Sequence, residues 1–255
     1  MDTVIKEKLH EIEARERVRI LHAVESGSRA WGFASPDSDY DVRFIYVREP
    51  EFYLRLDQTR DIIEWQLDDT LDINGWDLQK TLRLLQKSNP TLFEWANSPI
   101  VYYTTTEWER INGHIPDYFT SKSVVFHYLS MAKGNYREFL KRNMVRVKKY
   151  LYVLRPILAC KWILRNQSSP PMLFSDLVAA EAGLDLAIKQ EIDKLLEIKV
   201  NTPEIMEMPR IEPLNAYIDE TLSLLRAQAE ALPNAAGKGY DELNRLFVDI
   251  IVSVG

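Results

Sequence analysis

The sequence contains very little cysteine and few histidines. Its only cysteine is Cys160, and its four histidines are His10, His22, His114 and His127. A single thiol excludes an internal disulfide framework and a zinc site built from cysteines alone. The histidines show no ligand-like spacing, so the sequence does not predict a structural zinc site. Cys160 lies in an apolar run with helical spacing and is expected to be a small buried side chain, not a nucleophile.

Long apolar runs are also lacking. No stretch approaches the roughly 20 apolar residues that a membrane-spanning helix requires. Residues 1–8 lack the basic stretch and apolar run of a signal peptide. Of the 255 residues, 46% are hydrophobic and 27% are charged, which is typical of a globular protein with a full core. We therefore expect a cytoplasmic protein with no membrane association.

Net positive charge is absent as well, since the formal net charge is −6. This value argues against simple non-specific binding to nucleic acid. Residues 133–165 differ from the rest, with one acidic residue, Glu138, and a net charge of +9. The basic residues of this run are Lys133, Arg137, Lys141, Arg142, Arg146, Lys148, Lys149, Arg155, Lys161 and Arg165. The run is either a solvated helical face or a surface for the phosphates of a nucleotide or an RNA backbone.

The hydrophobic pattern changes near residue 115. Before this point, strand-like runs at 17–24, 41–47, 62–67 and 70–74 alternate with helical ones. The last two runs predict an antiparallel pair around a turn at Asp68-Asp69. From residue 122 onward the apolar spacing is helical, in segments at 122–141, 144–166, 184–199, 212–231 and 239–252. The sequence therefore predicts an α+β fold, with a mixed sheet and flanking helices in residues 1–115 and a helical domain in residues 116–255.

The segment with the clearest chemical pattern runs from residue 25 to residue 41. A predicted strand ends at Glu25, and Gly27-Ser28 opens a short helix whose N–H groups, with the Ser28 hydroxyl, are suited to binding nucleotide phosphates. Asp39 and Asp41 follow at the start of the next strand, and their spacing of two places them on one face. Two such carboxylates are suited to Mg²⁺. The alternative is a turn at 35–38 that these aspartates merely cap.

A third carboxylate usually completes a metal site of this kind. Asp72 is the first choice, because it lies within a predicted strand with its side chain opposed to those of its two apolar neighbours. Asp77 is a rival, although it is also explained as the N-cap of the helix that follows. Glu64 is a weaker alternative.

Three basic residues are candidates for binding the nucleotide. Arg29 directly follows the Gly-Ser turn, and Arg43 lies two residues after Asp41 on the same strand face. A guanidinium is a good partner for phosphate oxygens, although Arg43 would equally neutralise the carboxylates. Lys149, in the basic run, is expected to reach the nucleotide from the helical domain.

These motifs resemble the signature of the polymerase-beta-like nucleotidyltransferase superfamily, in which a Gly-Ser turn precedes an Asp-x-Asp strand. Residues 25–32, 87–91 and 148–156 are similar to a narrower group, the YcgL-like or RNA-ligase-associated nucleotidyltransferases. The resemblance spans about residues 18–165 and implies metal-dependent nucleotidyl transfer. It implies Asp39 and Asp41 as ligands of Mg²⁺ or Mn²⁺, and Gly27 and Ser28 as phosphate-binding residues.

The expected function is transfer of a nucleoside monophosphate from ATP or another NTP to a hydroxyl. RNA is the favoured acceptor, because the basic run offers a track for a backbone and the resemblance points to RNA repair. A protein acceptor is the alternative, as in a toxin–antitoxin pair whose enzyme modifies its partner. A further alternative is a nucleotide-sensing module with little turnover, against which the intact carboxylate pair argues.

Overall fold

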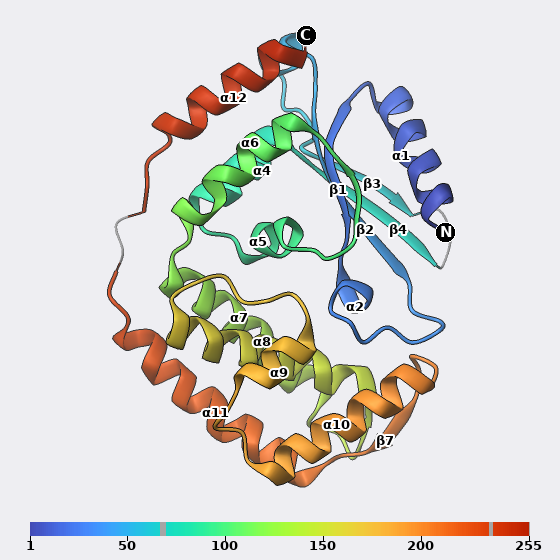
Figure 1. Cartoon of the computed structure of the whole chain (residues 1–255), viewed down its shortest axis with the longest axis vertical. Helices are drawn as coiled ribbons and strands as arrows, with labels where there is room; N and C mark the ends of the chain where they lie inside the picture. The colour runs from blue at the N-terminus through green and yellow to red at the C-terminus, as the bar shows by residue number, and fades with distance from the viewer. Residues whose placement is uncertain (67–69, 235–236, 255) are drawn as a thin grey trace. The chain divides into compact units, whose positions relative to one another are not determined.

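The computed structural model describes residues 1–66, 70–234 and 237–254. These residues form two compact units (Figure 1). The first comprises Met1–Gly27, Asp39–Tyr118 and Gly237–Gly255, and the second comprises Ser28–Ser38 and Phe119–Ala236. In the described parts of the chain, no helix is both long and apolar enough to cross a membrane.

The first unit is built on a five-stranded mixed sheet with the order β3-β4-β2-β1-β5. β1 pairs antiparallel with β2 and β5, β2 pairs parallel with β4, and β3 pairs antiparallel with β4. The strands are β1 (Arg19–Glu25), β2 (Tyr40–Val47), β3 (Ile62–Gln66), β4 (Leu71–Asp77) and β5 (Val101–Thr104). The expected strand pair is thus confirmed, whereas its turn at Asp68-Asp69 lies outside the described residues.

Helices surround this sheet. They are α1 (Asp2–Glu16), α3 (Pro50–Tyr53), α4 (Leu78–Gln86), α5 (Pro90–Ala96), α6 (Thr106–His114) and α12 (Asp241–Val254), with a 3₁₀ turn at Ile115–Tyr118. α1 covers one face, where Ile5, Leu9 and Ile12 join a core with Val42, Phe44 and Ile73. Because side chains alternate along a strand, Asp41, Arg43 and Asp72 lie on the opposite face.

The second unit is helical, as the spacing after residue 122 predicts. Its elements are α7 (Ser121–Phe139), α8 (Val147–Asn166), α9 (Phe174–Ala180), α10 (Leu186–Asn201), α11 (Glu212–Ala231) and a two-stranded sheet of β6 (Met144–Arg146) and β7 (Glu207–Pro209). α8 packs against α7, α9, α10 and α11. Most of α8 is buried, including Cys160, as expected.

Two segments belong to a different unit from the one that their position in the sequence suggests. α12, expected in the helical domain, packs on α4 in the first unit, and its Phe247 ring lies 5.1 Å from that of Tyr53. Residues 28–38 belong to the second unit, although the strands on both sides of them belong to the first. In both cases the packing partners are distant in sequence, so the local pattern carries no information about them.

Candidate active site

Asp41 and Asp72 lie side by side on parallel strands. The register of β2 and β4 pairs Asp41 directly with Asp72, and the next pair is Val42 with Ile73, both buried in the core. Apolar neighbours therefore fix which face the carboxylates take. Asp39 directly precedes β2 and is exposed. The two carboxylates come from chain positions 31 residues apart, and the pairing of β2 with β4 brings them together.

Arg43 connects these two carboxylates. Its Nη2 donates to Asp41 Oδ1 at 3.0 Å and to Asp72 Oδ2 at 2.8 Å. Its Nη1 donates to the carbonyl oxygens of Val42 and Asp72. The Arg43 side chain is only 18% exposed, whereas that of Asp72 is 46% exposed. Of the two roles expected for Arg43, this geometry supports charge neutralisation, because one guanidinium offsets the repulsion between two carboxylates.

Gly27 lies directly against the Asp41 carboxylate. Its φ is +60°, and a Cβ at this position would lie 2.0 Å from Asp41 Oδ2. The N–H of Ser26 donates to the Asp41 carbonyl at 2.8 Å. Only glycine adopts this backbone conformation readily, and a side chain here would displace the Asp41 carboxylate.

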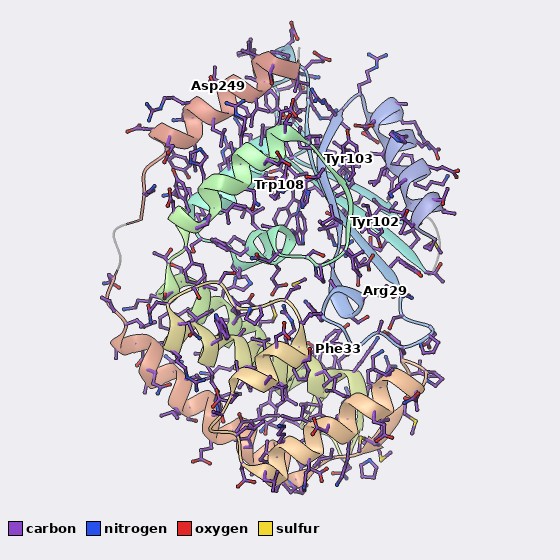
Figure 2. All side chains as sticks on the ribbon, viewed as in Figure 1. Arg29, Phe33, Tyr102, Tyr103, Trp108 and Asp249 are labelled. Atoms are coloured by element: carbon purple, nitrogen blue, oxygen red, sulfur yellow. The ribbon has the colours of Figure 1, made fainter. Side chains whose placement is uncertain are left out.

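The buried side chain of Glu25 contacts the backbone of Asp41. The sequence indicated Glu25 only as the end of a strand. The Asp41 N–H donates to Glu25 Oε1 at 2.8 Å. The hydroxyl of Tyr102, on β5 (Figure 2), donates to Glu25 Oε2, and Glu25 is fully buried. A buried carboxylate requires such donors. The sequence pattern that could have indicated this role is the position of Glu25 directly before Ser26-Gly27-Ser28, because an acidic residue is unusual at the end of an apolar strand.

The residues expected to bind phosphate divide between the two units. Gly27 belongs to the first unit, and Ser28 and Arg29 belong to the second. Ser28 is buried, and Arg29 Nη2 donates to the Ser38 carbonyl at 2.6 Å. α2 (Gly27–Ala30) is a single turn. Phosphate binding there would depend on individual N–H groups and the Ser28 hydroxyl, since a helix this short has a small dipole.

Lys149 lies in the second unit beside aromatic rings. Its Nζ is 3.6 Å from the centre of the Phe139 ring and 5.4 Å from that of Tyr152. Burial, with the neighbouring charge of Lys148, lowers the pKa of Lys149 below its usual value. Lys149, Arg142 and Arg146 line a cavity of about 260 Å³ that Glu138 and Glu207 also border.

Several residues of the basic run are engaged within the second unit. The engaged residues are Lys141 with Asp219, Lys148 with Glu204, Lys161 with Glu181 and Tyr217, Arg165 with Glu181, and Arg155 with Met172 and the ring of Trp31. Arg146 approaches Glu207 only to 3.9 Å. The +9 charge of this run is therefore partly offset by acidic residues that lie far from it in the sequence.

Asp77 occupies the opposite end of β4 from Asp72. It caps α4, accepting the N–H of Gln79 at 2.7 Å and the hydroxyl of Tyr53 at 2.9 Å. Burial raises the pKa of Asp77 to about 6. The predicted N-cap is thus confirmed. Asp72 pairs with Asp41, whereas Asp77 pairs with Tyr46 and Glu64 pairs with Asn74, so the strand register favours Asp72 as the third carboxylate.

The raised pKa of Asp77 predicts a pH-dependent effect of Asp77→Asn on stability. Between about pH 4 and pH 6 the folded state holds a proton that the unfolded chain has lost, so wild-type stability falls through this window as pH rises. The amide has no such proton. Between pH 4 and pH 7 the free energy of unfolding of the variant should therefore rise relative to that of wild type by on the order of 2–3 kcal/mol, as measured by urea unfolding.

Asp185→Asn is the matched control for this experiment, because Asp185 caps α10 in the same way but is exposed. It should show no such gain. Other groups that titrate in the window, such as buried His22, cancel in the comparison with wild type. If the free energies of unfolding of Asp77→Asn and wild type differed by the same amount across this pH range, the prediction would be wrong.

The residues at the carboxylate face fit a divalent cation of the Mg²⁺ or Mn²⁺ type. Asp39, Asp41 and Asp72 offer only carboxylate oxygens, which such ions prefer. Strand pairing brings Asp41 and Asp72 together, but the ligand atoms of all three aspartates do not lie within 4.8 Å of one another. The Asp41 side chain is 30% exposed and that of Asp72 is 46% exposed, so both carboxylates are open to solvent in part.

A second group of potential ligands lies elsewhere in the first unit. In residues 1–66, 70–234 and 237–254, His114, Asp117 and Glu242 are the one group of three whose ligand atoms all lie within 4.8 Å of one another. The spacing of the histidines could not indicate it, because Glu242 lies 128 residues after His114. The Lys238 ammonium lies 2.8 Å from Asp117 and 3.5 Å from Glu242, so a lysine already offsets part of the negative charge of this cluster.

One known protein is similar to this chain over almost its whole length. Over 251 residues the chain is 43% identical to the protein YcgL of Bacillus subtilis (strain 168), covering 98% of this chain and 96% of that protein. Two solved structures are more distantly similar. Spectinomycin adenyltransferase AAD(9) from Enterococcus faecialis, solved with ATP and spectinomycin, is 11% identical with a TM-score of 0.45 over 88% of this chain and 97% of that one. A nucleotidyltransferase-like protein from Exiguobacterium sibiricum 255-15 is 12% identical with a TM-score of 0.34, over 91% and 75%.

The family comparison covers nearly the whole sequence. The model of the RNA repair pathway DNA polymerase beta family (RlaP) matches residues 1–249, which includes the whole second unit, all but the last six residues of the first, and every candidate site residue. The expected similarity to polymerase-beta-like nucleotidyltransferases and to YcgL is confirmed. This chain belongs to the RNA repair pathway DNA polymerase beta family.

Proposed function

We propose that this protein transfers a nucleoside monophosphate from an NTP to a hydroxyl group. The observation that carries the proposal is the pairing of Asp41 with Asp72 in register, with the Gly27 backbone against the Asp41 carboxylate. Two adjacent carboxylates beside a glycine turn are suited to a nucleoside triphosphate with its metal ion. Membership of a polymerase-beta family supports the same reaction class.

Asp39, Asp41 and Asp72 would hold the metal ions. When bound, such ions neutralise the charge of the reacting phosphate and lower the pKa of an attacking hydroxyl. Arg43 would keep the two strand carboxylates together, because its guanidinium contacts both. Ser28 and Arg29 would bind the terminal phosphates, with the Gly27 turn allowing close approach of the backbone.

The reaction forms one bond and breaks another. The acceptor oxygen attacks the α-phosphorus of the NTP, and the bond from that phosphorus to its bridging oxygen breaks, so pyrophosphate leaves. The hydroxyl proton passes to a carboxylate. Asp72, the more exposed of the two strand aspartates, is our choice for this base.

RNA is the acceptor that we favour. The description of the family refers to RNA repair, and the second unit carries a surface cavity bordered by Arg142, Arg146 and Lys149. Guanidinium groups beside an aromatic ring suit an RNA strand, since they bind phosphates while the ring stacks on a base. Phe139 supplies that ring.

The function is tested by incubating the protein with each labelled NTP and Mg²⁺ or Mn²⁺, plus total RNA or a cell lysate. Label in RNA would support the proposal in full. Label in a lysate protein would keep the reaction and change the acceptor. Tight NTP binding without transfer to either fraction would replace the enzyme with a nucleotide-sensing module.

The RNA acceptor predicts a specific salt dependence. Arg142→Glu with Arg146→Glu should weaken RNA binding and flatten the plot of log K against log salt. Each lost phosphate contact lowers the slope by roughly 0.7 for a single strand. The NTP dissociation constant should stay the same, because the proposed phosphate site uses Gly27, Ser28 and Arg29. Lys148 is not a suitable probe, since it pairs with Glu204.

Arg226→Glu, on an exposed turn of α11 outside the basic run, is the control and should change neither quantity. Lys149→Met separates two roles for that residue. A higher NTP dissociation constant with an unchanged salt slope would assign Lys149 to the nucleotide. An unchanged slope in the double arginine variant would remove the electrostatic support for RNA.

A further inference from the structure

The segment between the Gly-Ser turn and the carboxylates is held by the second unit. Its first half is fixed by apolar contacts. The ring of Trp31 packs edge-on against Tyr152 at 5.5 Å, and the fully buried ring of Phe33 packs against Phe174 at 5.6 Å. The Phe174 N–H donates to the Trp31 carbonyl at 2.9 Å. These contacts place the beginning of the segment on α8 and α9.

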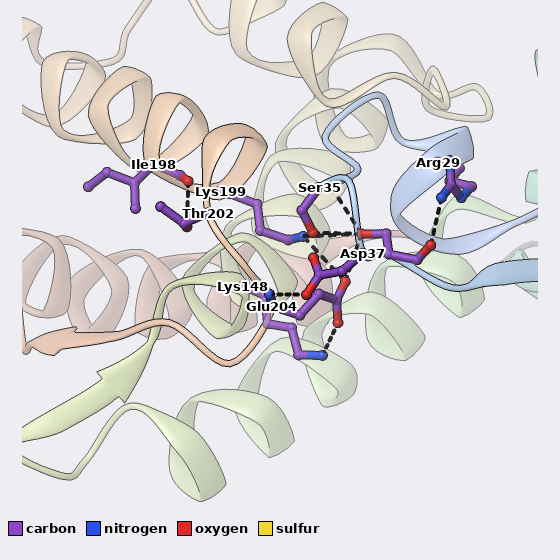
Figure 3. A network of polar contacts seen from close by, with 9 residues as sticks. Arg29, Ser35, Asp37, Lys148, Ile198, Lys199, Thr202 and Glu204 are labelled. Atoms are coloured by element: carbon purple, nitrogen blue, oxygen red, sulfur yellow. Dashed lines mark hydrogen bonds and ion pairs between the residues drawn. The ribbon is translucent and has the colours of Figure 1, made fainter. Parts of the chain in front are cut away.

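The second half is fixed by a buried polar cluster, here called the Ser38 cluster, of Ser35, Ser38, Lys199 and Glu204. Figure 3 labels Ser35, Lys199 and Glu204 of this cluster. Lys199, on α10, is 1% exposed, and its Nζ donates to Ser35 Oγ at 2.6 Å. It also donates to Ser38 Oγ at 3.2 Å and to Glu204 Oε1 at 3.3 Å. The Ser38 hydroxyl donates to Glu204 Oε1 at 2.8 Å. Lys148 donates to the other oxygen of this carboxylate.

Ser38 connects the cluster to the residues proposed to act on the nucleotide. Its side chain belongs to the cluster, while its carbonyl accepts Arg29 Nη2 at 2.6 Å. The next residue in the chain is Asp39. Removing one contact at Ser38 would therefore loosen both the Arg29 guanidinium and the backbone that leads into the first carboxylate.

Stability alone is a weak explanation for this cluster. Lysine is almost never fully buried unless it is paired, and a buried ion pair often contributes no more than apolar side chains of the same volume. The Trp31 and Phe33 contacts already hold the segment on the second unit. The cluster additionally fixes the orientation of the Ser35 and Ser38 hydroxyls and of the Ser38 carbonyl.

We propose that Lys199 and Glu204 are positioning residues, which act through Ser38 to hold Arg29 and the backbone before Asp39 in a fixed geometry for the nucleotide. This inference rests on the proposed function. Without the cluster, Arg29 and this backbone would have to become ordered when the nucleotide binds, and the free-energy cost of that ordering would lower the affinity for the nucleotide.

The test is Lys199→Met, which keeps the length of the side chain and removes its donors. Glu204 keeps Lys148 as a counter-ion, so no buried charge is left alone. The KM for NTP should rise roughly tenfold at a temperature well below the melting point of the variant. Amide exchange should accelerate at Ser35 and Ser38, whose N–H groups are bonded within the segment. Lys194→Met, on an exposed part of the same helix, should change neither quantity.

Ser38→Ala provides a second variant if Lys199→Met does not fold, because it removes only one hydroxyl. It should raise the KM for NTP in the same direction. A purely structural cluster would lower the melting temperature but leave the KM and the local exchange as in wild type, and that result would overturn the proposal.

The two proposals fail in different ways. If wild type transfers nucleotide and both variants keep its KM and its exchange pattern, positioning is overturned and the proposed function stands. If wild type neither binds nor transfers NTP, the proposed function is overturned. Faster exchange at 35–38 in Lys199→Met would then still show that the cluster orders this segment, because that measurement needs no substrate.

Discussion

Asparagine in place of Asp39 or Asp41 should abolish nucleotidyl transfer and leave the fold intact. Each change removes one anionic ligand from the proposed metal site while keeping the size of the side chain. Transfer of label from NTP is the measurement, with circular dichroism as the check on folding. Asp57→Asn is the control, since Asp57 is an exposed aspartate of the same unit that pairs only with Arg55 among the contacts described. More than about a tenth of wild-type activity in both site variants would remove the two-carboxylate mechanism.

The effect of these variants on stability should be small. From the sequence, two adjacent carboxylates suggest that removing one relieves repulsion and raises the melting temperature. In the structure Arg43 Nη2 already bridges Asp41 and Asp72, so that repulsion is largely offset. For Asp41→Asn, the lost ion pair with Arg43 opposes the relieved repulsion.

Asp72→Asn should lower turnover on the order of a hundredfold or more, which is the usual range for loss of a general base. The reason is its position, since Asp72 lies beside Asp41 in register and shares Arg43 with it. The measurement is kcat for NMP transfer at saturating NTP. Asp77→Ala should leave kcat nearly unchanged and instead cost about 1 kcal/mol of stability near pH 4, because it removes the cap of α4. Toward pH 7 this loss is opposed, because the variant no longer buries a carboxylate that must ionise.

The opposite pattern would reassign the third carboxylate to Asp77. Glu64→Gln serves as a further comparison, because Glu64 lies on β3, the edge strand beside β4, and is exposed. It should keep wild-type turnover. A loss of turnover in Glu64→Gln alone would move the base to the edge of the sheet.

The sequence by itself determined the local elements and the chemical type of the site. The cap of α4 by Asp77 depends on a carboxylate and an N–H two residues later, so both lie in the same short segment. The strand at 40–47 and the order of Gly27-Ser28 before Asp39 and Asp41 are likewise local patterns. Alternating burial along β4 also follows from period-two spacing, which placed Asp72 on the polar face before any pairing was known.

Only the tertiary structure decided which residues meet. The register that places Asp72 beside Asp41, the buried Glu25 behind Asp41, and the contact of Lys199 with a serine 164 residues away all join distant parts of the chain. So do the acidic partners of the basic run and the packing of α12 on α4. The periodicity of a helix or strand states which face is apolar, but not which other element covers it. The partners of Asp41, Ser38 and α12 therefore depend on long-range packing. A contact of this kind needs two surfaces, and a local sequence pattern describes only one of them.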